Sequence, residues 1–153
     1  MSGSMSVQTR FSLAIPGKTS RLKEVRRFVA RHGRRANLSE EVINAMRTAV
    51  DEACANIIEH AYHGVADQIV NIEVTVKPDC FVVSLRDQGA PFDRKAYREP
   101  DVRELTRSRA SGGLGVRMIH ALMDQVEYSS KGRTNEIRLT KFTRHQTDNL
   151  GKR

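Results

Sequence analysis

The sequence predicts an α+β fold, a two-layer α/β sandwich with helices on one face of a mixed, mostly antiparallel sheet. Segments of alternating apolar and polar residues, typical of half-buried strands, occur near both ends of the chain and in its middle. Between them lie segments with apolar residues at every third or fourth position, as in amphipathic helices. The predicted elements follow the order strand, helix, helix, strand, strand, helix, strand, strand. This order predicts one sheet covered by one layer of helices.

The chain begins with a predicted strand and a predicted helix. Residues 11–15 alternate between apolar and polar types and are followed by a Pro-Gly turn. Thr19 or Ser20 is expected to cap the helix that follows. This helix is expected to end at His32 and Gly33, and its outer face carries Arg and Lys.

A long helix and a hairpin make up the middle of the chain. Ser39 is predicted to cap a helix over residues 42–61, whose apolar residues recur for about five turns. Residues 70–76 and 81–85 then alternate in the manner of strands. The turn-forming segment 77–79 separates them, so we expect an antiparallel hairpin.

The second half contains a long connecting segment, a short helix and a second hairpin. Residues 90–113 are charged, have little apolar periodicity and end in glycines, which is typical of a mobile lid. Residues 114–123 form an apolar helical segment. A final hairpin is expected from residues 126–128 and 137–139, with its turn at Gly132.

The length of 153 residues fits one domain, since domains cluster around ~100–150 residues. We expect this domain to span residues 9–143. Residues 1–8 are expected to form a disordered N-terminus, of which the part before Met5 is consistent with an added tag, and residues 144–153 a flexible tail.

Composition restricts the function classes only partly. Lys and Arg outnumber Asp and Glu by 26 to 18, which suits a nucleic acid, an acidic protein surface or a nucleotide phosphate equally. Aromatic residues make up only 5% and no helix-turn-helix pattern is present, so direct nucleic-acid binding is not expected. No apolar run approaches the ~18 residues of a membrane helix, and no secretory signal is found, so we expect a cytoplasmic protein.

Three polar side chains follow one edge of the long predicted helix. Glu52, Asn56 and His60 are spaced four residues apart and therefore lie in a row. An Asn oxygen can ligate Mg²⁺ without adding charge, while a neighbouring Glu can take a proton from an attacking hydroxyl. Taken alone, the row is better explained as a solvated helix edge.

Two further segments combine polar groups with glycine. Asp87 ends a predicted strand, where its carboxylate could accept a hydrogen bond from an amine such as that of adenine, and Gly89 follows it. Residues 112–115 are rich in glycine and lead directly into a helix, whose free N–H groups can receive a phosphate. They match neither the dinucleotide-binding nor the P-loop motif, so a different nucleotide fold is required.

Taken in order, the three signals resemble the Bergerat-type ATPases, the superfamily that includes histidine kinases, gyrase and Hsp90. The match consists of Glu-x-x-x-Asn, Asp-x-Gly and a glycine-rich lid end. Residues 51–62, and residues 112–115 followed by Leu-Met-Asp at 122–124, look like the anti-sigma serine-protein kinase branch of this superfamily. The resemblance covers roughly residues 9–142.

The resemblance implies roles for single residues. Asn56 would bind Mg²⁺, Glu52 would act as general base toward a substrate serine, and Asp87 would read adenine. Two lid arginines nearest the glycines are expected to neutralise phosphate charge. The full set of predicted nucleotide-binding residues is Asn56, His60, Asp87, Gly89, Phe92, Arg107, Arg109, Gly112, Gly113, Leu114, Gly115 and Thr134.

The resemblance also implies a function. We expect an ATP-dependent serine-protein kinase and anti-sigma factor that binds a sigma factor and phosphorylates a STAS-type anti-anti-sigma antagonist, with Mg²⁺ as the metal and a homodimer as the assembly. The alternative is a nucleotide-gated regulator that binds a partner without kinase activity. A sensor histidine kinase fragment ranks lower, because the sequence shows no dimerisation helix with a phosphoacceptor His.

Overall fold

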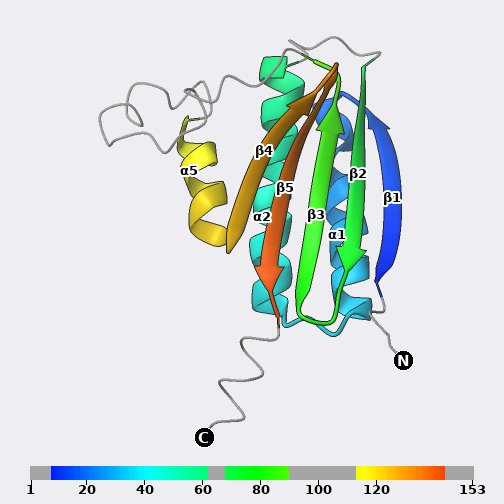
Figure 1. Ribbon diagram of the computed structural model, residues 1–153, viewed down its shortest axis with the longest axis vertical. Coiled ribbons are helices and arrows are strands. Elements are labelled where there is room, and N and C mark those ends of the chain that lie inside the picture. Colours follow the sequence, from blue (N-terminus) through cyan, green and yellow to red (C-terminus); the bar gives the residue numbers. More distant parts are fainter. Residues whose placement is uncertain (1–7, 62–67, 90–112, 144–153) are drawn as a thin grey trace, which may run out of the picture.

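The computed structural model describes residues 8–61, 68–89 and 113–143, and it confirms the α+β two-layer sandwich (Figure 1). The predicted lid and most of the two predicted tails lie outside these residues. No helix of the described part of the chain is long and apolar enough to cross a membrane. In chain order, the main elements are β1 (Thr9–Pro16), α1 (Leu22–Arg35), α2 (Glu40–Asn56), β2 (Ile69–Val76), β3 (Cys80–Asp87), α5 (Gly113–Leu122), β4 (Gln125–Lys131) and β5 (Thr134–Phe142).

The five strands form one sheet in the order β1-β2-β3-β5-β4, and every neighbouring pair is antiparallel. Helices α1 and α2 pack against each other behind the sheet, and α5 packs against α2 beside β4 (Figure 1). Strand β5 pairs with β3, although β4 precedes it in the sequence. Strands β1 and β4 are therefore the edges of the sheet, and β2, β3 and β5 lie inside it.

The core lies between the sheet and the helices. Alternate residues of each strand face it, as shown by the fully buried Val83 and Leu85 in β3 and Leu139 in β5. Burying a side chain of this size contributes roughly 1.5–3 kcal/mol. The predicted alternation thus identifies the buried face of each central strand correctly.

The start of the first helix differs from the prediction. Thr19–Arg21 forms a single 3₁₀ turn, η1, and α1 begins after it with Arg21 as the N-cap residue, which makes no side-chain capping bond. Thr19 and Ser20 therefore do not cap α1. The 3₁₀ turn adds one turn before α1 and contains Thr19 and Ser20, so neither residue is at the N-cap position of α1.

The end of α1 also differs, because the helix continues two residues beyond Gly33. Gly33 serves packing: a Cβ there would lie 2.9 Å from Ile43 Cγ1 of α2. Ala36 is the C-cap residue of α1, and Asn37 follows it with a φ of 62°, which lies in the left-handed region. The Leu38 N–H donates to the Gly33 carbonyl at 3.1 Å and the Asn37 N–H to the Arg34 carbonyl at 3.0 Å, as in a Schellman motif.

The predicted cap of the second helix is confirmed. The Ser39 hydroxyl accepts a hydrogen bond from the Val42 N–H at 3.2 Å, which satisfies one free donor of the first turn of α2. The helical path continues to Ala61 as predicted, but its last part, η2 (Ile57–Ala61), is a π-helical turn. Single π turns within helices are frequent at functional sites.

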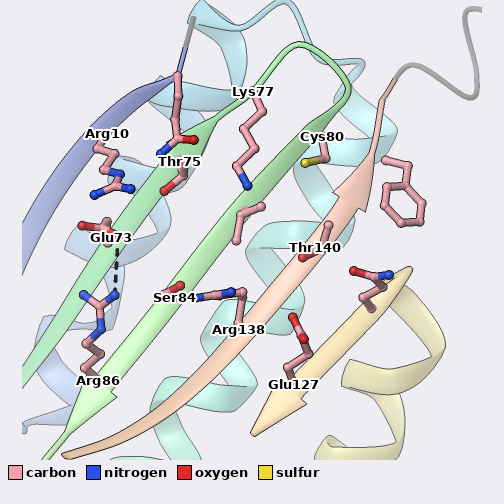
Figure 2. Close-up of a pocket in the computed structure, with 14 residues that line it drawn as sticks. Arg10, Glu73, Thr75, Lys77, Cys80, Ser84, Arg86, Glu127, Arg138 and Thr140 are labelled. Carbon is pink, nitrogen blue, oxygen red and sulfur yellow. Dashed lines mark ion pairs between the residues drawn. The ribbon is translucent and has the colours of Figure 1, made fainter. Parts of the chain in front are cut away.

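The face of the sheet opposite the helices is polar and slightly hollowed (Figure 2). Arg86 joins β2 to β5 across this face, with contacts of 3.6 Å to Glu73 and 2.8 Å to Glu136. Thr75, Ser84 and Thr140 are buried among the longer side chains, although no helix of the described residues covers them. Only one face of the sheet is therefore available for an apolar core.

His32 is the buried histidine of α1. Its ring stacks on Phe11 at 3.9 Å between centroids and meets the edge of Phe28 at 4.8 Å, and its Nδ1 has no hydrogen-bond partner among the described residues. Burial lowers the pKa of His32 below its ordinary value of 6.5, and the charges of Arg35 and Arg31 lower it further. The folded protein therefore holds this ring neutral.

We expect acidification below about pH 6.5 to destabilise the protein through His32. The unfolded chain binds a proton there at a higher pH than the folded chain does, so stability is lost as pH falls through the unfolded pKa toward the folded one. His32→Phe keeps the ring stacking and removes the titration. Urea unfolding of both proteins at neutral and acidic pH measures the effect. A pH dependence that is identical in the two proteins would contradict this assignment.

Candidate nucleotide-binding and phosphotransfer site

The polar residues predicted to act together lie on elements that end at the same end of the molecule. The last turns of α2, the end of β3, the start of β5 and the start of α5 all reach the upper end in Figure 1. Helix α2 packs against α5, β5 and β3, which holds these ends in one group. The elements that carry Glu52, Asn56 and Asp87 therefore end near one another in space.

Asp87 occupies a core position of the sheet. It continues the buried row of Phe81, Val83 and Leu85 on β3, and only 1% of its surface is exposed. A carboxylate in such a position is costly to bury unless hydrogen bonds compensate for the lost water. The hydrogen bonds of each carboxylate oxygen therefore show how far this cost is compensated.

One oxygen of Asp87 is well satisfied. Oδ1 accepts hydrogen bonds from the Gly89 N–H at 2.8 Å and from Asn135 Nδ2 at 3.0 Å. The same Asn135 amide donates to the Gly89 carbonyl at 3.2 Å, and its oxygen accepts from the Ser130 hydroxyl at 2.8 Å. This network fixes the Asp87 carboxylate and the backbone of Gly89 relative to each other.

The second oxygen is not satisfied. Asp87 Oδ2 is buried and has no hydrogen-bond partner among the described residues. Burial raises the pKa of Asp87, although the hydrogen bonds from Asn135 and Gly89 oppose this shift. A buried acceptor of this kind fits an incoming N–H donor, and the exocyclic amine of adenine is such a donor.

Asn135 of β5 was not among the predicted site residues but lies beside Asp87, whereas the predicted contact of Thr134 with nucleotide stays a prediction. Asn135, and not Thr134, lies opposite Asp87 in the β3–β5 pairing and donates to it. Side chains alternate along a strand, so Thr134 belongs to the other face from the buried Asn135. Asn135 was missed from the sequence, although a polar residue in the buried series of Ile137 and Leu139 could have revealed it.

Glu52 and Asn56 lie one turn apart near the end of α2. Glu52 is half-buried, and burial raises its pKa, with further increases from the charges of Asp51 and Glu59. Asp51 itself binds Arg26 at 2.6 Å, which attaches the end of α2 to α1. A carboxylate with a raised pKa is a stronger base than an ordinary glutamate, as a proton acceptor requires.

Asn56 is buried and is the last residue of α2 before η2. A buried carboxamide needs partners for its donor and acceptor groups, and its oxygen is a ligand type that Mg²⁺ accepts. The neighbouring Cys54 is fully buried, and burial raises the pKa of its thiol to about 12, so this thiol is unreactive at neutral pH.

The predicted phosphate-binding segment is described only in part. Gly113 is the first residue of α5, and Leu114 and Gly115 lie in its first turn, where backbone N–H groups have no partner within the helix. Four other predicted nucleotide contacts lie outside the described residues: Phe92, Arg107, Arg109 and Gly112. The side chain of His60 is also outside the described part of the structure. Their roles stay predictions.

Comparison with known proteins agrees with this arrangement. Residues 15–141 match the family model of the histidine kinase-like ATPase domain. The chain is therefore an ATP-binding domain of this class.

Curated relatives place it more narrowly. It is 31% identical over 137 residues to the serine-protein kinase RsbW of Bacillus pumilus, covering 85% of this chain and 83% of the relative. It is 30% identical over 142 residues to RsbW of Halalkalibacterium halodurans, with coverage of 90% and 86%. The chain belongs to the RsbW-like serine-protein kinases within the histidine kinase-like ATPase family.

Solved structures share the fold. The RsbU and RsbW domains of a Mycobacterium tuberculosis protein match with a TM-score of 0.63 at 14% identity, over 88% of this chain and 32% of that longer chain. The SiaB–SiaC complex of Pseudomonas aeruginosa matches with a TM-score of 0.64 at 14% identity, over 85% of this chain and 88% of that chain. At this identity the likeness concerns the fold alone.

Asp87→Asn should abolish the stabilisation by Mg-ATP without destabilising the free protein. The amide oxygen can keep the bonds from Gly89 and Asn135, but its NH₂ would then replace the free acceptor and meet the adenine amine as a second donor. For wild type, ligand at ~100 times its dissociation constant should raise the melting temperature by roughly 5–10 °C. Thermal unfolding with and without nucleotide measures both quantities.

Asp79→Asn provides the matched control, because Asp79 is an exposed aspartate in the β2–β3 turn. It should retain the full nucleotide-induced rise. An undiminished rise in the Asp87 variant would show that this carboxylate does not read the base.

Proposed function

We propose that this chain transfers the γ-phosphoryl group of ATP to a serine hydroxyl of a protein partner. The observation that carries the proposal is the combination of an unsatisfied, buried Asp87 oxygen with a Glu52 of raised pKa at the same end of the fold. The first provides a place for the base of the nucleotide and the second provides a proton acceptor. The kinship with serine-protein kinases supports this pairing.

Glu52 acts as the general base. Its carboxylate accepts the proton of the serine hydroxyl while the serine oxygen forms a bond to the γ-phosphorus and the bond to the leaving ADP breaks. Half-burial at the helix end restricts water around this carboxylate and keeps its pKa raised. The raised pKa makes this carboxylate a better proton acceptor than an ordinary glutamate.

Asn56 and Asp87 hold the nucleotide at its two ends. Asn56 is the ligand for Mg²⁺, and Asp87 accepts the adenine amine beside the backbone of Gly89, which has no side chain to block the base. Mg-ATP supplies the phosphoryl group and the cation that neutralises its charge. The first turn of α5 offers its free N–H groups to phosphate oxygens.

The partners follow from the same kinship. We propose that the chain binds a sigma factor, that its substrate is a STAS-type anti-anti-sigma antagonist, and that it acts as a homodimer in the cytoplasm. Phosphorylation of the antagonist would weaken its binding, because a phosphate adds negative charge and desolvation cost at the interface. The kinase would then be free to hold the sigma factor.

Glu52→Gln should reduce phosphotransfer by roughly 10²–10⁴-fold, the usual contribution of a general base, while ATP binding is retained. Transfer of labelled phosphate to a STAS-type antagonist measures the rate, and the thermal shift with Mg-ATP measures binding. In wild type, the rate should fall on acidification at a higher pH than for a glutamate of ordinary pKa 4.5, because the base must be ionised.

Glu41→Gln is the control for this substitution, since Glu41 is an exposed glutamate in the first turn of the same helix. It should leave transfer unchanged. If Glu52→Gln transfers phosphate at the wild-type rate, Glu52 is not the base. If wild type binds ATP and the antagonist but transfers nothing, the chain is a nucleotide-gated binding module.

Asn56→Ala should remove the dependence of nucleotide binding on Mg²⁺. In wild type, adding Mg²⁺ to ATP should enlarge the rise in melting temperature, whereas in the variant the rise should be small with or without the metal. Asn44→Ala, which changes an exposed asparagine of the same helix, should behave like wild type. Equal responses to Mg²⁺ in all three proteins would exclude Asn56 as the ligand.

A further inference from the structure

A basic surface covers the solvent side of α1 and the adjoining part of α2. Its charged residues surround the small Ala30 and line one shallow hollow, and no carboxylate lines it. We call it the cationic surface, and it consists of Lys23, Arg26, Arg27, Arg31, Arg34 and Arg35 of α1 and Arg47 of α2. These seven basic residues contribute much of the net charge of +8 of the chain.

The cationic surface is regular. Lys23, Arg27, Arg31 and Arg35 follow each other at intervals of four residues, so they form one stripe along α1. Four helical residues correspond to a rise of about 6 Å, and the stripe extends for about 18 Å. Arg34 and Arg47 flank it on the side of α2.

Some of these cations are paired within the chain and others are not. Arg26 binds Asp51 at 2.6 Å, and Arg34 binds Glu40 through two contacts of 3.2 Å. Among the described residues, no ion pair is found for Arg27, Arg31, Arg35 or Arg47. Glu24 lies near Lys23 and Arg27, and Glu40 lies near Arg47. Like charges four residues apart still repel one another on a helix, and this repulsion acts between Arg31 and Arg35.

The helix dipole explains only part of the stripe. Arg34 and Arg35 lie in the last turn of α1, where cations are favourable. Lys23 and Arg27 lie in the first half of the helix, where the dipole provides no such benefit. The dipole therefore does not explain the positions of Lys23 and Arg27.

The chemistry of the surface favours carboxylates over a nucleic acid. Its existing partners, Asp51 and Glu40, are carboxylates, and Glu40 receives two N–H groups of one guanidinium, the geometry that suits planar anions. No aromatic residue lines the hollow on which a base could stack. Carboxylates on every fourth residue of a helix would match the stripe in spacing.

We infer that the cationic surface is a docking site for an acidic helical segment of a protein partner. The segment lies along α1 with its carboxylates facing Arg27, Arg31 and Arg35. Asp87, Asn56 and Glu52 do not line this hollow, and the inference holds whether or not Glu52 acts as the base. Such contacts among exposed charges control the rate and specificity of association and weaken with salt.

A labelled helical peptide provides the test. The probe has about 20 residues of Ala with Glu at every fourth position, which is long enough for an isolated helix. Fluorescence anisotropy with the full chain should show binding at roughly 50 mM salt that weakens as salt rises. Reversal of two charges, Arg27→Glu with Arg31→Glu, should weaken binding roughly tenfold or more.

The control reverses two exposed cations elsewhere, Arg10→Glu with Lys77→Glu on the open face of the sheet, and changes the net charge equally. It should bind the peptide nearly as well as wild type. Arg27→Gln with Arg31→Gln should lose affinity to a smaller extent than the reversal, and the Mg-ATP thermal shift verifies folding of each variant.

Two results would overturn the inference. If both double reversals weaken peptide binding equally, overall charge and not this surface is responsible. If a DNA duplex binds more tightly than the peptide at roughly 150 mM salt and loses affinity on reversal of Arg27 and Arg31, the occupant is a nucleic acid. Absence of peptide binding to wild type at low salt would also exclude the docking site.

Discussion

The burial of one carboxylate at a core position of the sheet is the constraint on which the rest of the site depends. Asp87 stands where the strand pattern calls for an apolar residue, and its desolvation must be compensated. Compensation comes from Asn135 and Gly89, which requires β5 to enter the sheet beside β3. Among the described residues, the second oxygen of Asp87 has no hydrogen-bond partner, so it can accept a hydrogen bond from a ligand.

The two layers have divided roles. Apolar residues along the strands and helices hold the sheet to α1 and α2, whereas the ends of the elements carry the chemistry. Helix α2 belongs to both, because its middle is buried in the core and its last turns present Glu52 and Asn56. The π turn that follows Asn56 still packs in the core, because its residues Ile57 and Ile58 are buried. This arrangement fits an RsbW-like kinase whose partners must reach one end of the molecule.

Periodicity alone was sufficient for the fold class, the element order and the buried faces, because alternation and helical spacing persist throughout 69–76, 80–87 and 40–56. It failed where tertiary contact overrides local preference. Gly33 was taken as a helix end, but it faces Ile43 within the helix. The motifs located Glu52, Asn56 and Asp87, whereas Asn135 depends on pairing between strands 48 residues apart, which a local pattern does not contain.

The polar outer face of the sheet has a consequence for how the strands find their alignment. A shift of β5 by one residue against β3 would exchange its two faces, turning Glu136 and Arg138 toward the helices and Ile137 and Leu139 toward water. It would also remove Asn135 from Asp87 and leave the carboxylate without its donor. A misaligned sheet is thus penalised both by solvation and at the binding site. The strand alignment that buries Ile137 and Leu139 is therefore also the alignment that brings Asn135 to Asp87.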